Sequence, residues 1–127
     1  MSDKMLNGVR VLIVDDEKII RDTLGELLEL DGAVVSQASD GNEAFEMIKA
    51  YNYNVVLSDI RMPECSGVDL LKRVRAEKKE LMPPILLMSA FTDISTDKAK
   101  EMGAKGMFIK AEDSKYLKEM LVNSIQS

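Results

Sequence analysis

Five short apolar segments, each followed by residues with helical spacing, constrain this chain more than any other feature. The segments are strand-sized and cover residues 9–14, 33–35, 55–57, 85–88 and 107–109. Most are continuous apolar runs, which is typical of parallel strands covered by helices on both faces. Strict alternation of strand and helix predicts an α/β fold, in which an open, doubly wound parallel sheet carries helices on both faces.

The helices predicted between these strands rest on apolar stripes and capping residues. Asp40 is expected to cap the second helix, with Glu43 placed to reach back to it. The fourth spans roughly residues 95–102, has little apolar surface and is closed by Gly103, while the fifth covers about 113–125. In the first helix, a stripe that stops before Asp31-Gly32 consists of Ile19, Ile20, Thr23, Leu24, Leu27 and Leu28.

The length and composition favour one soluble domain. We expect residues 1–8 to form a short unstructured lead and residues 9–127 a single domain. A formal net charge of −5 argues against direct binding to nucleic acid. No apolar run approaches the ~18 residues of a membrane span, and no signal peptide is recognisable, so neither membrane insertion nor export is predicted. Cys65 is the single cysteine, which fits a reducing cytoplasm.

Polar residues stand at the predicted carboxyl ends of the strands, where sheets of this kind bind ligands. In chain order these are Asp15-Asp16-Glu17, Ser36 to Ser39, Asp59, Ser89 and Lys110. Carboxylates brought together repel each other unless a cation or a proton intervenes. The chain has no histidine, and oxygen ligands suit a hard cation such as magnesium. The pattern therefore predicts a magnesium site.

Four motifs occur in order, each at the end of its own predicted strand. They are VLIVDD at residues 11–16, SDIRMP at 58–63, MSA at 88–90 and GAKGMFIK at 103–110. With these motifs the sequence closely resembles the response-regulator receiver family from about Val9 onward. The resemblance implies a flavodoxin-like (βα)5 sandwich with strand order 2-1-3-4-5. In that order, the acidic residues after the first and third strands become neighbours.

The resemblance also implies a role for each residue at the strand ends. Asp59 would accept a phosphoryl group, whose oxygens would contact Lys110 and Ser89. The groups implied to hold Mg²⁺, with Mn²⁺ as a possible substitute, are Asp16, Asp59, the backbone carbonyl of Arg61 and, through water, Asp15. The implied donor is a phosphohistidine on a sensor histidine kinase or a histidine phosphotransfer protein. On this interpretation the chain is a signalling domain and not an enzyme.

The sequence departs from the usual pattern of this family near its last motif. Met107 occupies the position, three residues before the lysine, where the family usually carries Tyr or Phe. Phe108 is one residue out of register and is expected in the core. Ala111 replaces the proline that commonly follows the lysine. A switch that uses the rotamers of Met107 remains a hypothesis.

Three further positions belong to the family's switching and tuning set. They are Ala90, and Arg61 and Phe91, which lie two residues beyond Asp59 and Ser89. A bulky cation and an aromatic ring there would shield an aspartyl phosphate from water. We therefore expect slow self-dephosphorylation.

Several alternatives stay open at this stage. The protein acts alone, or as a phosphorelay intermediate, or it is the excised receiver of a larger regulator. In the family, downstream targets dock on the fourth helix, fifth strand and fifth helix. An aspartyl-phosphate phosphatase is a distant alternative, because such enzymes place the nucleophile in a D-x-D pattern at the first strand. A flavin-binding protein would need a Ser/Thr-rich phosphate loop where this chain has acids.

Overall fold

The computed structural model describes residues 5–62, 65–77, 82–89, 95–109 and 117–126. Strands and helices alternate throughout, in the order β1 (Arg10–Val14), α1 (Lys18–Leu30), β2 (Val34–Ala38), α2 (Gly41–Ala50), β3 (Val55–Asp59), α3 (Gly67–Glu77), β4 (Ile85–Ser89), α4 (Thr96–Glu101), β5 (Gly106–Ile109) and α5 (Leu117–Gln126). All strand pairs are parallel, and the sheet order is β2-β1-β3-β4-β5. The predicted fold class and strand order are confirmed.

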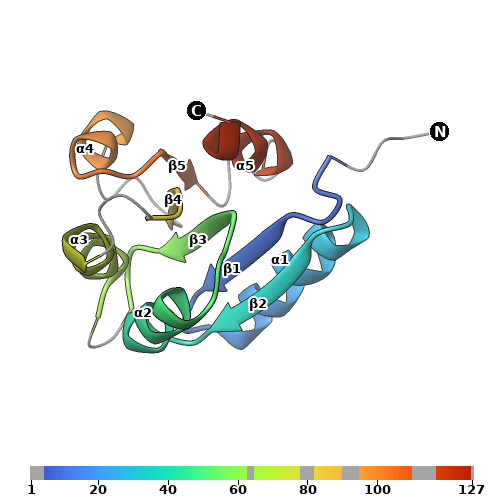
Figure 1. Cartoon of the computed structure of the whole chain (residues 1–127), viewed down its shortest axis with the longest axis horizontal. Coiled ribbons are helices and arrows are strands. Elements are labelled where there is room, and N and C mark those ends of the chain that lie inside the picture. The colour runs from blue at the N-terminus through green and yellow to red at the C-terminus, as the bar shows by residue number, and fades with distance from the viewer. Residues whose placement is uncertain (1–4, 63–64, 78–81, 90–94, 110–116, 127) are drawn as a thin grey trace.

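Helices cover both faces of this sheet (Figure 1). On one face, α2, α3 and α4 pack over a core that includes Leu12, Val56 and Leu87. On the other, α1 and α5 pack over a core that includes Ile13, Leu57 and Phe108. Successive residues of each strand thus enter opposite cores, which explains why the strands are continuous apolar runs. The core position predicted for Phe108 is confirmed.

Strand β2 is longer than its apolar residues predict. It continues through Ser36 and Gln37 to Ala38, because the chain pairs with β1 along that whole length. Val34 and Gln37 are exposed on this edge strand. An edge strand needs fewer apolar residues than a central one, so the hydrophobic pattern underestimated its extent.

The predicted apolar stripe of α1 is only partly correct. Leu28 is fully buried, and Ile20 and Leu24 pack against the same core. Ile19 is 78% exposed and Leu27 is 38% exposed, so the expectation that both face inward is wrong. Each of these two residues precedes a core residue by one position, which places it about 100° away around the helix axis.

The expectation of an unstructured lead is wrong for residues 5–8, which form a turn docked on the domain. Leu6 is fully buried in the core beneath α1 and α5. Its backbone N–H donates to Asp31 Oδ2 at 2.9 Å, and the Gly8 N–H donates to the Gly32 carbonyl at 2.9 Å. Leu6 is the only buried residue of this turn, and one leucine does not form a pattern from which a docked segment can be predicted.

The capping predictions hold for α2 and α4. Asp40 Oδ1 accepts from the Glu43 N–H at 2.8 Å, and Glu43 Oε1 accepts from the Ser39 N–H at 2.9 Å. Gly103, just beyond α4, has a φ of 106°, a left-handed conformation that favours glycine. Of the predicted fifth helix, residues 113–116 lie outside the described residues. None of the described helices combines the length and apolar character needed to cross a membrane.

Candidate functional site

The carboxyl ends of β1, β3 and β4 bring three of the predicted site residues to one edge of the sheet. Val14 pairs with Ser58, so Asp15 and Asp59 end neighbouring strands side by side. Asp59 in turn pairs with Met88, the residue before Ser89. Asp15 is 0% exposed, Asp59 7% and Ser89 2%. A polar row is therefore buried at the end of an otherwise apolar sheet.

Every buried polar side-chain atom among the described residues has a hydrogen-bond partner. The hydroxyl of Ser58, for example, donates to the Asp59 carbonyl at 3.1 Å. Because burying a polar group without such a partner costs free energy, this row is compatible with a stable fold.

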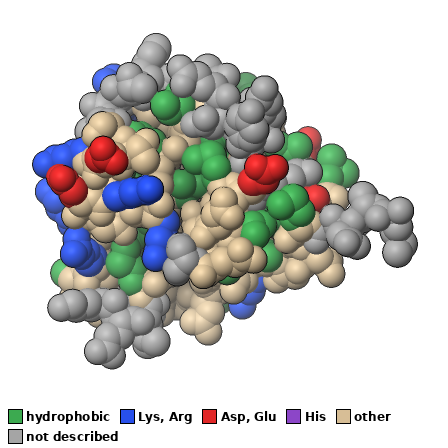
Figure 2. Space-filling view, turned by 90° about the horizontal axis from the view of Figure 1, so that it is seen from above, with side chains coloured by type: hydrophobic (Ala, Val, Ile, Leu, Met, Phe, Trp, Pro, Cys, Tyr) green, Lys and Arg blue, Asp and Glu red, His purple; other side chains and the backbone are tan. Residues whose placement is uncertain are grey.

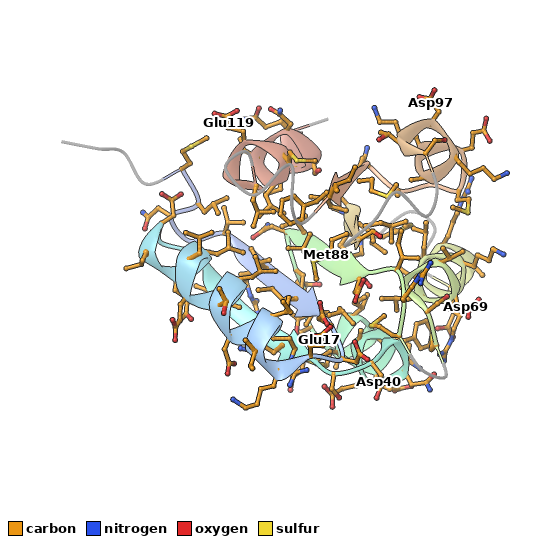
Figure 3. The ribbon with its side chains drawn as sticks, turned by 180° about the vertical axis from the view of Figure 1, so that it is seen from behind. Glu17, Asp40, Asp69, Met88, Asp97 and Glu119 are labelled. Carbon is orange, nitrogen blue, oxygen red and sulfur yellow. The ribbon has the colours of Figure 1, made fainter. Side chains whose placement is uncertain are left out.

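The loop after β1 gathers three carboxylates. Asp15, Asp16 and Glu17 each offer an oxygen, and these oxygens all lie within 4.8 Å of one another. Asp16 and Glu17 are exposed, and Figure 3 shows Glu17 at the same end of the sheet as Asp40. Asp59 does not belong to this group of three. The loop thus presents carboxylates to solvent beside the buried Asp59.

Two hydrogen bonds fold this loop tightly. The Asp15 N–H donates to the Ala38 carbonyl on β2 at 3.2 Å, and Asp15 Oδ1 accepts from the Glu17 N–H at 2.9 Å. A side-chain oxygen that accepts from the N–H two residues on is the usual way an aspartate shapes a turn. The same residue therefore ends the strand and orders the next acids.

The segment between β3 and α3 lies directly against the end of β3. The Ile60 N–H donates to the Met88 carbonyl at 3.0 Å, and the Gly67 N–H donates to the Ile60 carbonyl at 2.9 Å. A Cβ atom on Gly67 would overlap the carbonyl oxygen of Asp59. Glycine is therefore required here, because only a residue without a side chain permits this approach.

An open depression lies beside these residues. It is lined by Asp16, Ile60, Arg61, Met62 and Ser66. Asp16 and Arg61 come from different loops, so the depression joins the acidic loop to the segment after Asp59. Carboxylate and carbonyl oxygens are the donors that Mg²⁺ accepts, and this cation retains several waters, which an open site allows. The residues present fit such a cation.

The sequence matches the model of the response regulator receiver domain over residues 11–122. The chain belongs to this family. Among curated relatives, the protein-glutamate methylesterase/protein-glutamine glutaminase of Methanococcus maripaludis is 38% identical over 104 residues, which cover 78% of this chain and 28% of that protein. The transcriptional regulatory protein PdtaR of Mycobacterium tuberculosis is 32% identical over 80% of this chain and 49% of its own length. The receiver thus spans less than half of these relatives.

Solved receiver structures agree with the fold. The response regulator TrrA of Thermotoga maritima, in complex with Mg(2+)-BeF, has a TM-score of 0.81 at 32% identity, with 91% of this chain and 98% of that one covered. The chemotaxis response regulator CheY4 of Vibrio cholerae has a TM-score of 0.76 at 31% identity, with coverage of 94% and 98%.

Other predicted residues of the receiver are placed less completely. Arg61 is exposed and Met107 is 4% exposed. The predictions for Lys110, Phe91, Ala90 and Ala111 fall outside the described residues and stay predictions.

Sequence reasoning listed Glu17 at the strand end without giving it a role, and the structure places it in the carboxylate group. Two other contributors were missed. Gly67 contacts the end of β3. Arg21 Nη1 donates to the Asp15 carbonyl at 2.6 Å. Arg21 lies about one helical turn after the acids, and this spacing is the signal that would have found it. Nothing in the sequence reveals the approach of Gly67, because that contact depends on the path of the loop before it.

Proposed function

We propose that this receiver accepts a phosphoryl group on Asp59 from a phosphohistidine donor and thereby changes a partner-binding surface. One observation carries the proposal: Asp59 is buried at the end of β3, beside Asp15 and next to the depression that Asp16 and Arg61 line. A carboxylate in this setting is a nucleophile that needs no general base. Catalysis would then depend mainly on positioning and charge neutralisation.

The groups proposed to hold Mg²⁺ are Asp16, Asp59, the backbone carbonyl of Arg61 and, through water, Asp15. When bound, the cation would offset the negative charge of the transferring phosphoryl oxygens. The acidic cluster and the Mg(2+)-BeF complex of the Thermotoga maritima relative support this assignment. Mn²⁺ has similar ligand preferences and is expected to substitute.

The remaining contacts to the phosphoryl group would come from the neighbouring strands. Ser89, at the end of β4, is proposed to donate its hydroxyl to one oxygen, and Lys110 is proposed to pair with another. Gly67 lies against the Asp59 carbonyl and donates to the Ile60 carbonyl, so it holds the backbone after Asp59 close to the strand end, which supports a role for the Arg61 carbonyl as a ligand. Arg61 and Phe91 would limit the access of water, which gives the slow self-dephosphorylation expected above.

The donor is proposed to be a sensor histidine kinase or a histidine phosphotransfer protein, because the chain has no histidine of its own. We place the protein in the cytoplasm, where such a donor would meet it. The role is that of a phosphorylated signalling domain and not of an enzyme with an external substrate.

The output surface is proposed to be the face formed by α4, β5 and α5. A cavity of about 320 Å³ lies there, and its lining includes Lys100, Lys105, Met107 and Met120. Figure 2 views this side of the molecule and shows basic side chains gathered towards α4, with hydrophobic ones beside them. Because Met107 lies on the strand that leads to Lys110, a change at the phosphorylation site would reach this face through β5.

Transfer of phosphate from a phosphorylated sensor histidine kinase, in the presence of Mg²⁺, tests the central claim. Wild type should become labelled, whereas Asp59→Asn should not. Asp69→Asn serves as the matched control, since Asp69 is an exposed aspartate on α3. Equal labelling of wild type and Asp59→Asn would refute the assignment of Asp59. Acylphosphates are cleaved by hydroxylamine, so label that survives this reagent would also contradict it.

A further inference from the structure

Arg21 lies under the acidic loop and contacts its backbone rather than its carboxylates. Its Nη1 donates to the carbonyl oxygen of Asp15 at 2.6 Å. That carbonyl belongs to the peptide unit that joins Asp15 to Asp16. Since a peptide unit is planar, a hydrogen bond to its oxygen restricts the orientation of both residues it connects.

The two neighbouring peptide units are held as well. The Asp15 N–H is bonded to β2, and the Asp15 carboxylate accepts from Glu17. Without Arg21, the Asp15–Asp16 peptide could still rotate about the bonds that flank it. With Arg21, the strand end, the peptide oxygen and the next amide each have a hydrogen-bond partner, so the backbone on both sides of Asp16 is held.

Arg21 is itself oriented by a chain of polar contacts across α1 and β2. Its Nε donates to Gln37 Oε1 at 3.1 Å, and Gln37 Nε2 donates to Asp22 Oδ1 at 3.2 Å. Asp22 Oδ2 in turn accepts from Lys18 Nζ at 2.6 Å. Arginine suits this position because its planar guanidinium presents several donors in a fixed geometry.

We propose that Arg21, held by Gln37, is a positioning residue for the divalent-cation site, and that it raises cation affinity by fixing the Asp15–Asp16 peptide. The proposal rests on the proposed function. A positive charge near three carboxylates would by itself weaken cation binding, because like charges repel. Charge and position therefore predict opposite effects when Arg21 is removed, and this opposition makes the proposal testable.

The probe is MgCl₂ alone, titrated into the full chain, and binding is followed by NMR at the Glu17 amide. Urea unfolding in EDTA shows whether each variant folds in the absence of the cation. Removal of a group that orients a metal ligand typically costs 10–100-fold in affinity. For Arg21→Met we expect the dissociation constant for Mg²⁺ to rise by about tenfold or more. Gln37→Ala, which leaves Arg21 in place but unoriented, should give a smaller rise in the same direction. Arg21→Lys keeps the charge and one donor and should restore part of the affinity.

Lys18→Met is the matched charge control. Lys18 belongs to the same first turn of α1 and stands at the far end of the chain of polar contacts. Its removal leaves both side-chain hydrogen bonds of Arg21, to Gln37 and to the Asp15 carbonyl, in place. The dissociation constant of Lys18→Met for Mg²⁺ should stay unchanged or fall. If Arg21→Met binds Mg²⁺ as tightly as wild type, or more tightly, Arg21 is not a positioning residue and the proposal fails. If Arg21→Met does not fold, unchanged affinity in Gln37→Ala overturns it instead.

The outcome for wild type separates this proposal from the proposed function. Mg²⁺ should shift the Glu17 amide resonance in wild type, and Asp16→Asn should abolish this shift. If either result fails, the cation site itself is refuted. If wild type binds and Asp16→Asn does not, the site stands, and the Arg21 variants alone decide the proposal.

Discussion

Replacement of Gly67 by alanine tests how closely the segment after Asp59 approaches β3. The added Cβ would overlap the Asp59 carbonyl oxygen and would also lie 3.0 Å from the Asp59 carbonyl carbon and 3.1 Å from Ile60 Cα. All three are backbone atoms, so no side chain can rotate away. Overpacking of this kind typically costs 1–3 kcal/mol. We expect a loss near the upper end, about 2–3 kcal/mol, because only backbone movement relieves the contact.

Gly25→Ala is the matched control, since Gly25 is also a buried glycine in a helix. A Cβ there would meet its nearest atoms at 3.5–3.9 Å, which is ordinary van der Waals contact. Alanine in a helix interior is favoured over glycine by about 0.5–1 kcal/mol, so this variant should be more stable than wild type.

Urea and thermal unfolding measure both changes. For a domain of this size, each kcal/mol changes the melting temperature by roughly 3–5 °C, so Gly67→Ala should melt about 6–15 °C lower. Its Ile60 amide resonance should also move, because that N–H donates to the Met88 carbonyl. If both variants gain stability, or if the Ile60 resonance stays in place, the close approach of Gly67 to Asp59 is wrong.

Three shorter predictions concern other elements. Asp40→Ala should destabilise the domain by about 1 kcal/mol in urea, whereas Asp40→Asn, which keeps an acceptor, should cost much less; equal losses would contradict the cap. Hydrogen bonds from Lys18 and Gln37 hold the pKa of Asp22 below its usual value. Because the pKa is lowered by folding, the associated stability is present above the unfolded pKa and is lost as the pH falls through the folded pKa. Lys18→Met should raise the pKa of Asp22 in a ¹³C NMR titration, and an unchanged pKa would refute the pairing. Met107 should change rotamer when beryllofluoride and Mg²⁺ are added, and an unchanged methyl resonance would count against a methionine switch.

The sheet was predictable because its strands are buried on both faces. Continuous runs such as Val55–Leu57 and Ile85–Met88 have few alternatives to a parallel core strand. The order of motifs along the chain carried the family resemblance, and this resemblance implied the strand order. The edge strand and α1 were less predictable. Ser36 and Gln37 belong to β2 through backbone pairing, which their side chains do not signal. In α1, Ile19 and Ile20 are the same residue type. They differ only in their position around the helix axis, which the sequence does not fix.

The site was predictable to the extent that it depends on strand ends. Parallel strands end at one edge, and the strand order implied by the family resemblance made the first and third strands neighbours, so Asp15 and Asp59 were expected side by side without knowledge of any loop. Contacts that depend on loop path or helix orientation were missed. Gly67 touches Asp59 across a loop, and Arg21 reaches the Asp15 carbonyl from the next helix. Both contacts are made to backbone atoms, which every residue shares, so the residue types of the contacted positions do not reveal them. For Arg21, only its spacing after the acids is a signal.

The position of Met107 bears on how a phosphorylated Asp59 would influence a partner. Met107 is buried in the core under α2, α3 and α4 and also lines the cavity between α4 and α5. Two neighbours in the sheet, Leu87 and Met107, are paired, so the backbone of β5 follows that of β4. Ser89 pairs with Ile109, two residues after Met107, so a movement at Ser89 would act directly on β5. A methionine side chain can adapt to such a displacement by changing its torsions, at little cost in packing. If Met107 is the switch, a phosphorylated Asp59 would influence this face through a buried flexible side chain, at a position where the family usually carries an aromatic ring.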